Sequence, residues 1–168
     1  VSPDKSQAIC GGRDVLKLIS LVPSLSEKKN FRSGKSNLKH SAVELAWHPR
    51  HCELILSASC KSDIILWNLE KQHAKQIEKT YDEHKMPAYS LQWSPTDDNF
   101  FISAGRDKCI KLWDRRCEVS VSTIDCKNEQ PNMVRFNPFN PDIVACAVDS
   151  GAIEFWDLRR NDCISKHI

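Results

Sequence analysis

The fold is decided by SAGRDKCIKLWD, Ser103 to Asp114, together with the preceding EHKMPAYSLQWSP, Glu83 to Pro95. In the earlier segment Leu91 and Trp93 alternate with polar residues, which is the period of a half-buried strand. The run from Phe100 to Ser103 is almost continuously apolar and predicts a strand buried on both faces. A polar turn separates this run from a third strand, IKLW. The stretch therefore predicts short consecutive strands joined by tight turns.

This stretch belongs to an internal repeat with three full copies. The tryptophans that end the third strand are 46 and 43 residues apart, and a proline precedes each of them by 18 residues. The dipeptides are Trp67-Asn68, Trp113-Asp114 and Trp156-Asp157, and the prolines are Pro49, Pro95 and Pro138. A repeat of this length indicates units that stack and share a continuous core.

Each copy predicts four strands, of which the last is the most polar. The second strands are the apolar runs 54–57, 100–103 and 143–146, and the fourth strands are expected near 74–79, 119–124 and 162–167. Large aromatic residues end the first and third strands and are expected to anchor the core of each unit. These anchors are Trp47, Trp67, Trp93, Trp113, Phe136 and Trp156.

Composition narrows the function classes. The chain has 168 residues, of which 40% are hydrophobic and 27% charged, so it is expected to fold around a real core. The net charge of +2 is too balanced to predict nucleic acid as a partner, and no apolar run is long enough to insert into a membrane. The eight cysteines form no Cys-x-x-Cys pair, which favours reduced thiols in the cytosol or nucleus over a zinc ribbon or a disulfide framework.

Four short strands per unit of about 43 residues, ending in Trp-Asp, resemble the WD-repeat β-propeller family. The resemblance implies an all-β fold: a partial propeller over 1–168 with full blades at 38–80, 84–125 and 127–168. ICGGRDVLKLISLV near the start resembles SAGRDKCIKLWD, so 1–33 is expected to be a degenerate, incomplete blade. These blades are about half of the roughly seven or eight that close a ring. The chain is therefore expected to be a segment of a longer protein, or to pair edge to edge with a second copy.

The resemblance also implies a structural tetrad, in which a histidine, a serine, a turn aspartate and a tryptophan form one hydrogen-bonded chain. By position these are His84, Ser103, Asp107 and Trp113. The other full copies depart from the pattern at Leu38 and Lys61, and at Lys127 and Ser150, with Asp149 one residue early. The aspartate can tie the turn to the loop before the first strand, so we interpret the set as structural and not as a hydrolase triad.

Other candidate chemistry is weak. The basic segment 28–40 could bind phosphate or form a solvated loop, and it is the part of the chain that a nucleic-acid role would need. His48, His51 and Cys52 lie close in sequence, but they surround a turn proline and have no second ligand cluster nearby in sequence. No phosphate-cradling glycine loop or thiol-nucleophile signature is present. We therefore predict no enzyme activity, no cofactor and no metal.

Partner binding is expected on the face formed by the loops before the first strands and between the second and third strands. Arg106 and Lys61 fall in the latter turns and are candidates for it. Arg116 and Arg159 complete Trp-Asp-x-Arg motifs that resemble those of substrate receptors of cullin-RING ubiquitin ligases. The alternative for both arginines is pairing with acids of their own blade.

A longer resemblance covers nearly the whole chain. GGRDVLKLISL, SGKSNLKHSAVELAWHP, LWNLEKQ, DEHKMPAYSLQWSP and FWDLRRNDCIS run in an order similar to the amino-terminal propeller of the WD-repeat subunit of the GATOR/SEA complex. The resemblance implies a scaffold that binds other protein subunits and helps regulate the target-of-rapamycin kinase complex. It also implies a cytoplasmic protein that reaches the lysosomal or vacuolar surface through its partners. A nuclear location and a ligase receptor remain the alternatives.

Overall fold

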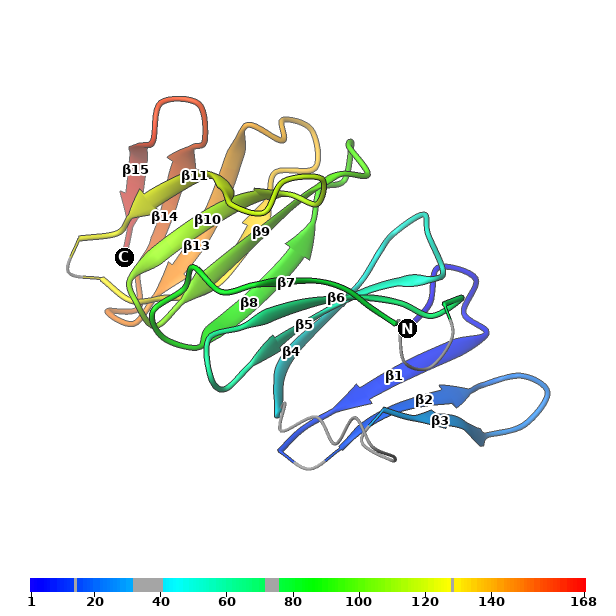
Figure 1. The fold of residues 1–168 in the computed structure, drawn as a ribbon. Coiled ribbons are helices and arrows are strands. Elements are labelled where there is room, and N and C mark those ends of the chain that lie inside the picture. Colours follow the sequence, from blue (N-terminus) through cyan, green and yellow to red (C-terminus); the bar gives the residue numbers. More distant parts are fainter. Residues whose placement is uncertain (14, 32–40, 72–75, 128) are drawn as a thin grey trace.

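The computed structural model describes residues 1–13, 15–31, 41–71, 76–127 and 129–168. Within these residues the chain forms fifteen strands in four antiparallel sheets, which follow one another in chain order from the blue to the red end (Figure 1). Strands that are neighbours in a sheet are also neighbours in sequence, as tight turns require. The all-β fold class and the partial propeller are therefore confirmed. The described part holds no helix of the length and apolarity that crossing a bilayer requires.

The sheets are named here by their order. Sheet 1 contains β1 (Gln7–Gly11), β2 (Leu16–Ser20) and β3 (Ser26–Asn30). Sheet 2 contains β4 (Ala42–Trp47), β5 (Leu54–Ser59), β6 (Ile64–Asn68) and β7 (Ile77–Tyr81). Sheet 3 contains β8 (Ala88–Trp93), β9 (Phe100–Gly105), β10 (Cys109–Asp114) and β11 (Ser120–Asp125). Sheet 4 contains β12 (Pro131–Phe136), β13 (Ile143–Val148), β14 (Ile153–Asp157) and β15 (Asp162–His167).

The fourth strand of sheet 2 differs from the sequence expectation. It runs over Ile77–Tyr81, whereas the sequence predicts a strand near 74–79. Its sequence IEKTY carries only two apolar side chains, so the hydrophobic pattern marks its ends poorly. Residues 72–75 and the expected boundary between the first two units, 33–38, lie outside the described residues.

The sheets pack face against face through their first strands. β4 lies against β8, and β8 lies against β12. The indole Nε1 of Trp93 donates to the carbonyl of Ala46 at 3.1 Å, and the amide of Val134 donates to Ser90 Oγ at 3.2 Å. Sheet 1 approaches just as closely, because a Cβ on Gly11 would lie 2.8 Å from the Cβ of Ala42. Sheet 1 therefore packs on sheet 2 as an incomplete fourth layer.

Burial of the second strands follows the number of neighbouring sheets. All six residues of β5 are buried, and five of the six residues of β9 are buried. β13 instead alternates between half-buried and buried residues, which corrects the expectation that every second strand is buried on both faces. Within the described chain only one face of sheet 4 is covered by another sheet, so only one side of β13 is covered.

The aromatic anchors lie in the core to different extents. Trp113 is fully buried, with Phe101 stacked on it at 5.9 Å between ring centroids. Tyr81 of the preceding sheet meets the same indole at 5.2 Å, so the cluster joins sheets 2 and 3. Trp67, Trp93, Phe136 and Trp156 are also buried. Trp47 is the exception, because it is only half-buried and packs at the border of the core.

We expect Trp113→Ala to destabilise β9 and β10 by ~3–5 kcal/mol, because a fully buried indole leaves a cavity. Hydrogen exchange of these strands in the full-length protein should become faster by about two to four orders of magnitude. Phe139→Ala is the control, since Phe139 is 96% exposed and its loss should cost less than about 0.5 kcal/mol. Equal exchange in the two variants would contradict the central role of Trp113.

Candidate functional site

Four side chains of sheet 3 form one hydrogen-bonded chain at the end of the sheet. His84 lies in the loop between β7 and β8, and Asp107 lies in the turn between β9 and β10. The Nδ1 atom of His84 is 2.9 Å from Asp107 Oδ2, and its Nε2 atom is 2.6 Å from Ser103 Oγ. Trp113 Nε1 donates to the same Ser103 oxygen at 2.8 Å. The structure thus brings together the four residues that the resemblance singled out.

The chemistry of the acceptors fixes the proton positions. The Asp107 carboxylate can only accept, so His84 Nδ1 carries a proton and Nε2 accepts from the Ser103 hydroxyl. Burial has the largest single effect on Asp107 and would raise its pKa. The hydrogen bond and favourable electrostatics of His84, together with the backbone amides of Lys85 and Cys109, outweigh burial and hold the pKa below its usual value. Ser103 is fully buried, and its oxygen already accepts the Trp113 proton. The serine is therefore not accessible to a substrate, unlike the nucleophile of a triad.

Gly105 allows this close arrangement. A Cβ at this position would lie 2.6 Å from Asp107 Oδ1 and 2.8 Å from His84 Nδ1. Both distances are shorter than any ordinary carbon contact, so a larger residue would push the histidine and the aspartate apart. The glycine that ends β9 is thus part of the tetrad's geometry.

The neighbouring sheets keep parts of this arrangement. In sheet 2, Trp67 Nε1 donates to Ser57 Oγ at 2.8 Å, while Leu38 lies outside the described residues. In sheet 4, Cys146 stands at the position of this serine, and the Trp156 indole donates instead to Glu154 at 3.2 Å. Asp149 accepts the backbone amide of Gln130 at 3.0 Å, so it ties its turn to the loop before β12 although it stands one residue early. The function of the aspartate is retained even though its position has shifted.

The arginines of the two Trp-Asp-x-Arg motifs are exposed but paired within their own sheets. Arg116 holds Asp114 with two parallel bonds of 2.9 and 2.6 Å. Arg159 Nη2 lies 2.8 Å from Asp142 Oδ2. The Arg116 guanidinium lowers the pKa of Asp114. The alternative of pairing inside the blade thus describes both side chains.

The face that carries the tetrad also carries exposed lysines. A hollow of about 410 Å³ opens there, with Lys85, Lys108 and Lys127 on its lining beside Asp107. Arg106 and Lys61 are exposed on their own turns but are not among the lining residues. Lys85 and Lys108 were not predicted at this face from the sequence, although their positions in turns next to His84 and Asp107 would have been the signal.

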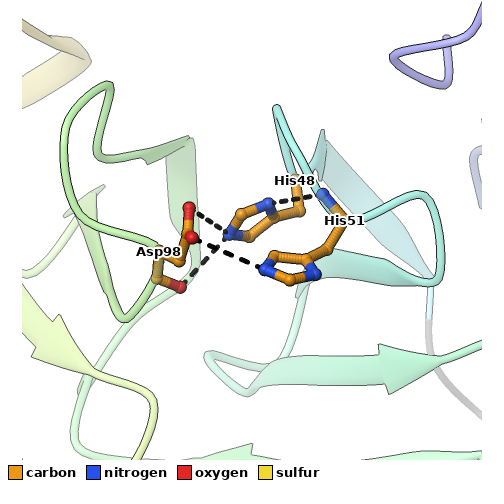
Figure 2. A group of neighbouring side chains, drawn as sticks. All are labelled: His48, His51 and Asp98. Carbon is orange, nitrogen blue, oxygen red and sulfur yellow. Dashed lines mark hydrogen bonds and ion pairs between the residues drawn. The ribbon is translucent and has the colours of Figure 1, made fainter.

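A second cluster joins sheets 2 and 3 on the side of the turns that follow their first strands (Figure 2). His48 and His51 come from the turn between β4 and β5, and Asp98 comes from the turn between β8 and β9. One ligand-type atom from each residue lies within 4.8 Å of the others. Cys52, which the sequence placed with the two histidines, is exposed and does not belong to the set.

Hydrogen bonds already occupy both ring nitrogens of His48. Its Nδ1 atom accepts the backbone amides of Arg50 and His51 at 3.1 and 3.0 Å, so the proton is on Nε2. Nε2 therefore donates to the backbone carbonyl of Asp98 at 3.1 Å. The Arg50 guanidinium also binds the Asp98 carboxylate. A metal ion would have to displace the Nε2 proton and compete with a cation, so the cluster favours a clamp between sheets over a metal centre.

The environment of His48 disfavours its charged form. The side chain is 1% exposed, and burial is the main cause that lowers its pKa. The hydrogen bond to the Asp98 carbonyl and the nearby Asp98 carboxylate act in the opposite direction, while His51 and the Arg50 guanidinium act with burial. His48 is accordingly held in its neutral form against Trp93, whose ring centroid is 4.5 Å away.

Comparison with known proteins agrees with the repeat geometry. The sequence model of the family described as Eukaryotic translation initiation factor eIF2A matches residues 35–167. The chain belongs to this family. Among curated relatives of this WD-repeat chain, the GATOR2 complex protein WDR24 of Danio rerio is 29% identical over 164 residues, which are 96% of the chain and 21% of that protein. The GATOR2 complex protein WDR24 of Homo sapiens is 27% identical with the same coverage.

A further relative of the WD-repeat chain is the protein transport protein SEC31 of Saccharomyces cerevisiae. It is 24% identical over 133 residues, which cover 77% of the chain and 10% of that protein. The chain spans about a fifth of the length of the WDR24 relatives that it matches. The resemblance of the sequence to the WD-repeat family, and to its GATOR branch, is thereby confirmed.

The neutral His48 predicts a stability that depends on pH. Its folded-state pKa is lowered, so the unfolded chain binds the proton first as the pH falls below about 6.5. The contribution of His48 is present above that pH and is lost below it. We expect the melting temperature of the full-length protein to fall from pH 7.5 to pH 5.5.

His48→Asn is the matched variant for this prediction, because an Asn137 side chain caps the equivalent turn of sheet 4. The variant should melt at a lower temperature at pH 7.5 and change less between the two pH values. The two melting temperatures are compared by scanning calorimetry in the same buffers. An identical pH dependence in the variant would show that His48 does not carry the effect.

Proposed function

We propose that this WD-repeat chain is a non-enzymatic protein-interaction scaffold in a complex similar to GATOR2. The observation that carries the proposal is similarity over 96% of the chain to relatives that are named for that complex in several animals. Translation initiation, which the family description mentions, is not part of the proposal, because these long matches point to another assembly.

The site geometry supports a role without catalysis. One set of side chains resembles a hydrolase triad: His84, Ser103 and Asp107. Their polar atoms are already occupied by hydrogen bonds to one another and to the Trp113 indole. Its serine oxygen is buried beneath the turn and has no path to a substrate. Strand-rich repeats that share a continuous core provide stable platforms, and their loops remain free to bind partners.

The finer parts of the proposal follow the same resemblance. The partners are other protein subunits of the complex, and no cofactor or nucleic acid is involved. The complex acts in nutrient signalling to the target-of-rapamycin kinase. The chain is cytoplasmic and reaches the lysosomal or vacuolar surface through its partners. Each sheet is one blade, with boundaries at 1–33, 38–80, 84–125 and 127–168.

The test is affinity purification of the full-length protein from its own cells, followed by identification of the proteins recovered in stoichiometric amounts. We expect further GATOR-type subunits. Recovery of a cullin adaptor without such subunits would contradict the proposal and would favour a ubiquitin-ligase receptor.

Charge reversal at the exposed Arg116 distinguishes the scaffold from the ligase receptor independently. Arg116 neutralises Asp114 of its own sheet, so Arg116→Glu should leave complex assembly intact. The buried Asp114 carboxylate also accepts the backbone amide of residue 116 at 2.9 Å, a bond that the substitution retains, so the variant should still fold. Loss of a bound cullin adaptor in this variant would instead assign Arg116 to ligase recruitment. Co-purification from the same cells provides the measurement.

A further inference from the structure

The turn after the first strand is built in the same way in sheets 2, 3 and 4. The first residue of each turn, His48, Ser94 or Asn137, accepts two backbone amides with its side chain. The donors are Arg50 and His51 at 3.1 and 3.0 Å, Thr96 and Asp97 at 3.3 and 3.2 Å, and Phe139 and Asn140 at 2.9 and 3.2 Å. Equivalent positions in these turns can therefore be compared directly.

At the junction between sheets 2 and 3, named here the 2–3 junction, the space between the turns that follow the first strands is filled by the chain itself. A separate hollow of about 350 Å³ lies beside the first strands, with Glu44 and Arg135 on its lining. The His48 ring reaches beyond its turn to the Asp98 carbonyl and the Trp93 ring. Arg50 follows it across the junction, binds the Asp98 carboxylate and donates to the Pro95 carbonyl at 3.0 Å. A basic turn thus closes the gap against an acidic one (Figure 2).

The corresponding 3–4 junction, between sheets 3 and 4, is hollow. Smaller or acidic residues stand there in place of the basic ones: Ser94 for His48, Thr96 for Arg50 and Asp97 for His51. Pro141 stands where Asp98 does in the preceding repeat. A cavity of about 250 Å³ remains, lined by these residues together with apolar side chains. Those apolar side chains are Phe100, Leu112, Phe136 and Leu158.

Size and charge restrict what the cavity can receive. Sites for small molecules usually measure ~300–1,000 Å³, so about 250 Å³ suits a single large side chain better than a metabolite. The lining carries two carboxylates, Asp97 and Asp142, and one guanidinium, Arg159, which is already bound to Asp142. The cavity is therefore complementary to a basic occupant that combines an apolar ring with a donor.

We propose that the 3–4 junction is a docking site for a basic segment of a partner protein, which inserts one aromatic ring bearing an N–H group. The ring packs on Phe136 and Leu158, and its N–H group points to the backbone carbonyl of Pro141, as His48 does to that of Asp98. A neighbouring arginine or lysine of the partner lies near Asp97. The turn HPRH at 48–51 is the internal example of such a segment.

The experiment uses the full-length protein and a fluorescein-labelled HPRH peptide as the probe, with an SPTD peptide as the negative control. Binding is measured by fluorescence polarisation at low and high salt. We expect a dissociation constant on the order of 1 mM or tighter for HPRH, weaker binding at high salt, and no binding of SPTD.

Two variants of one residue make the test specific. Ser94→His should keep the turn, place its own ring in the cavity and weaken binding of the probe at least tenfold. Ser94→Asn provides the same cap that Asn137 supplies in sheet 4, leaves the cavity open and should bind within about threefold of the wild type. Thr96→Arg is a second plug at the rim and should weaken binding even if Ser94→His does not fold.

Equal binding of the HPRH peptide by the wild type, Ser94→His and Thr96→Arg would overturn the proposal. So would a wild type that binds HPRH no better than SPTD. The inference deepens the scaffold role and rests on it only in taking the partner to be a protein. The two can fail separately: peptide titration tests the cavity, while co-purification of GATOR-type subunits tests the assembly.

Discussion

A four-stranded sheet of this kind has two apolar faces, and each face needs another sheet to cover it. This constraint explains why the sheets stack and why burial differs from one sheet to the next. β5 has a sheet on each side and is buried throughout, whereas β13 has a sheet on one side within the described chain and alternates. The aromatic anchors act at these contacts, since Tyr81 of sheet 2 packs on Trp113 of sheet 3. Stability is therefore shared between neighbouring layers and does not belong to any sheet alone.

Much of the fold could be predicted from the sequence because it is encoded locally. The spacing of the tryptophans and the alternation around Trp93 mark inner strands, whose side chains meet the core. Outer strands carry a weaker signal, as β3 shows with the sequence SEKKN. The same weakness explains the displaced start of β7. An edge strand is held mainly by backbone hydrogen bonds, which every sequence can make, so its composition says little about its bounds.

The candidate sites likewise differ in how far they could be predicted from local sequence. His84, Ser103 and Asp107 could be placed because the family resemblance assigns them fixed positions in one repeat. The contact between His48 and Asp98 could not, since the two residues are 50 positions apart and meet only because turns of adjacent sheets face each other. The exchange of serine for Glu154 as the partner of Trp156 was missed for another reason. The resemblance assigns that partner to the position of Ser103, which Cys146 occupies in sheet 4, and the glutamate instead lies two residues before the tryptophan on β14 itself.

The repeat shows how one backbone device can support different surfaces. The cap of the turn after the first strand needs only an acceptor atom near the backbone, which imidazole, hydroxyl and amide groups all supply. What extends beyond that atom is not constrained by the turn. In His48 the remainder of the ring seals a junction, and in Ser94 nothing remains to do so. The side chain that caps the turn therefore also decides whether the space between neighbouring turns is filled, as at His48, or left open, as at Ser94.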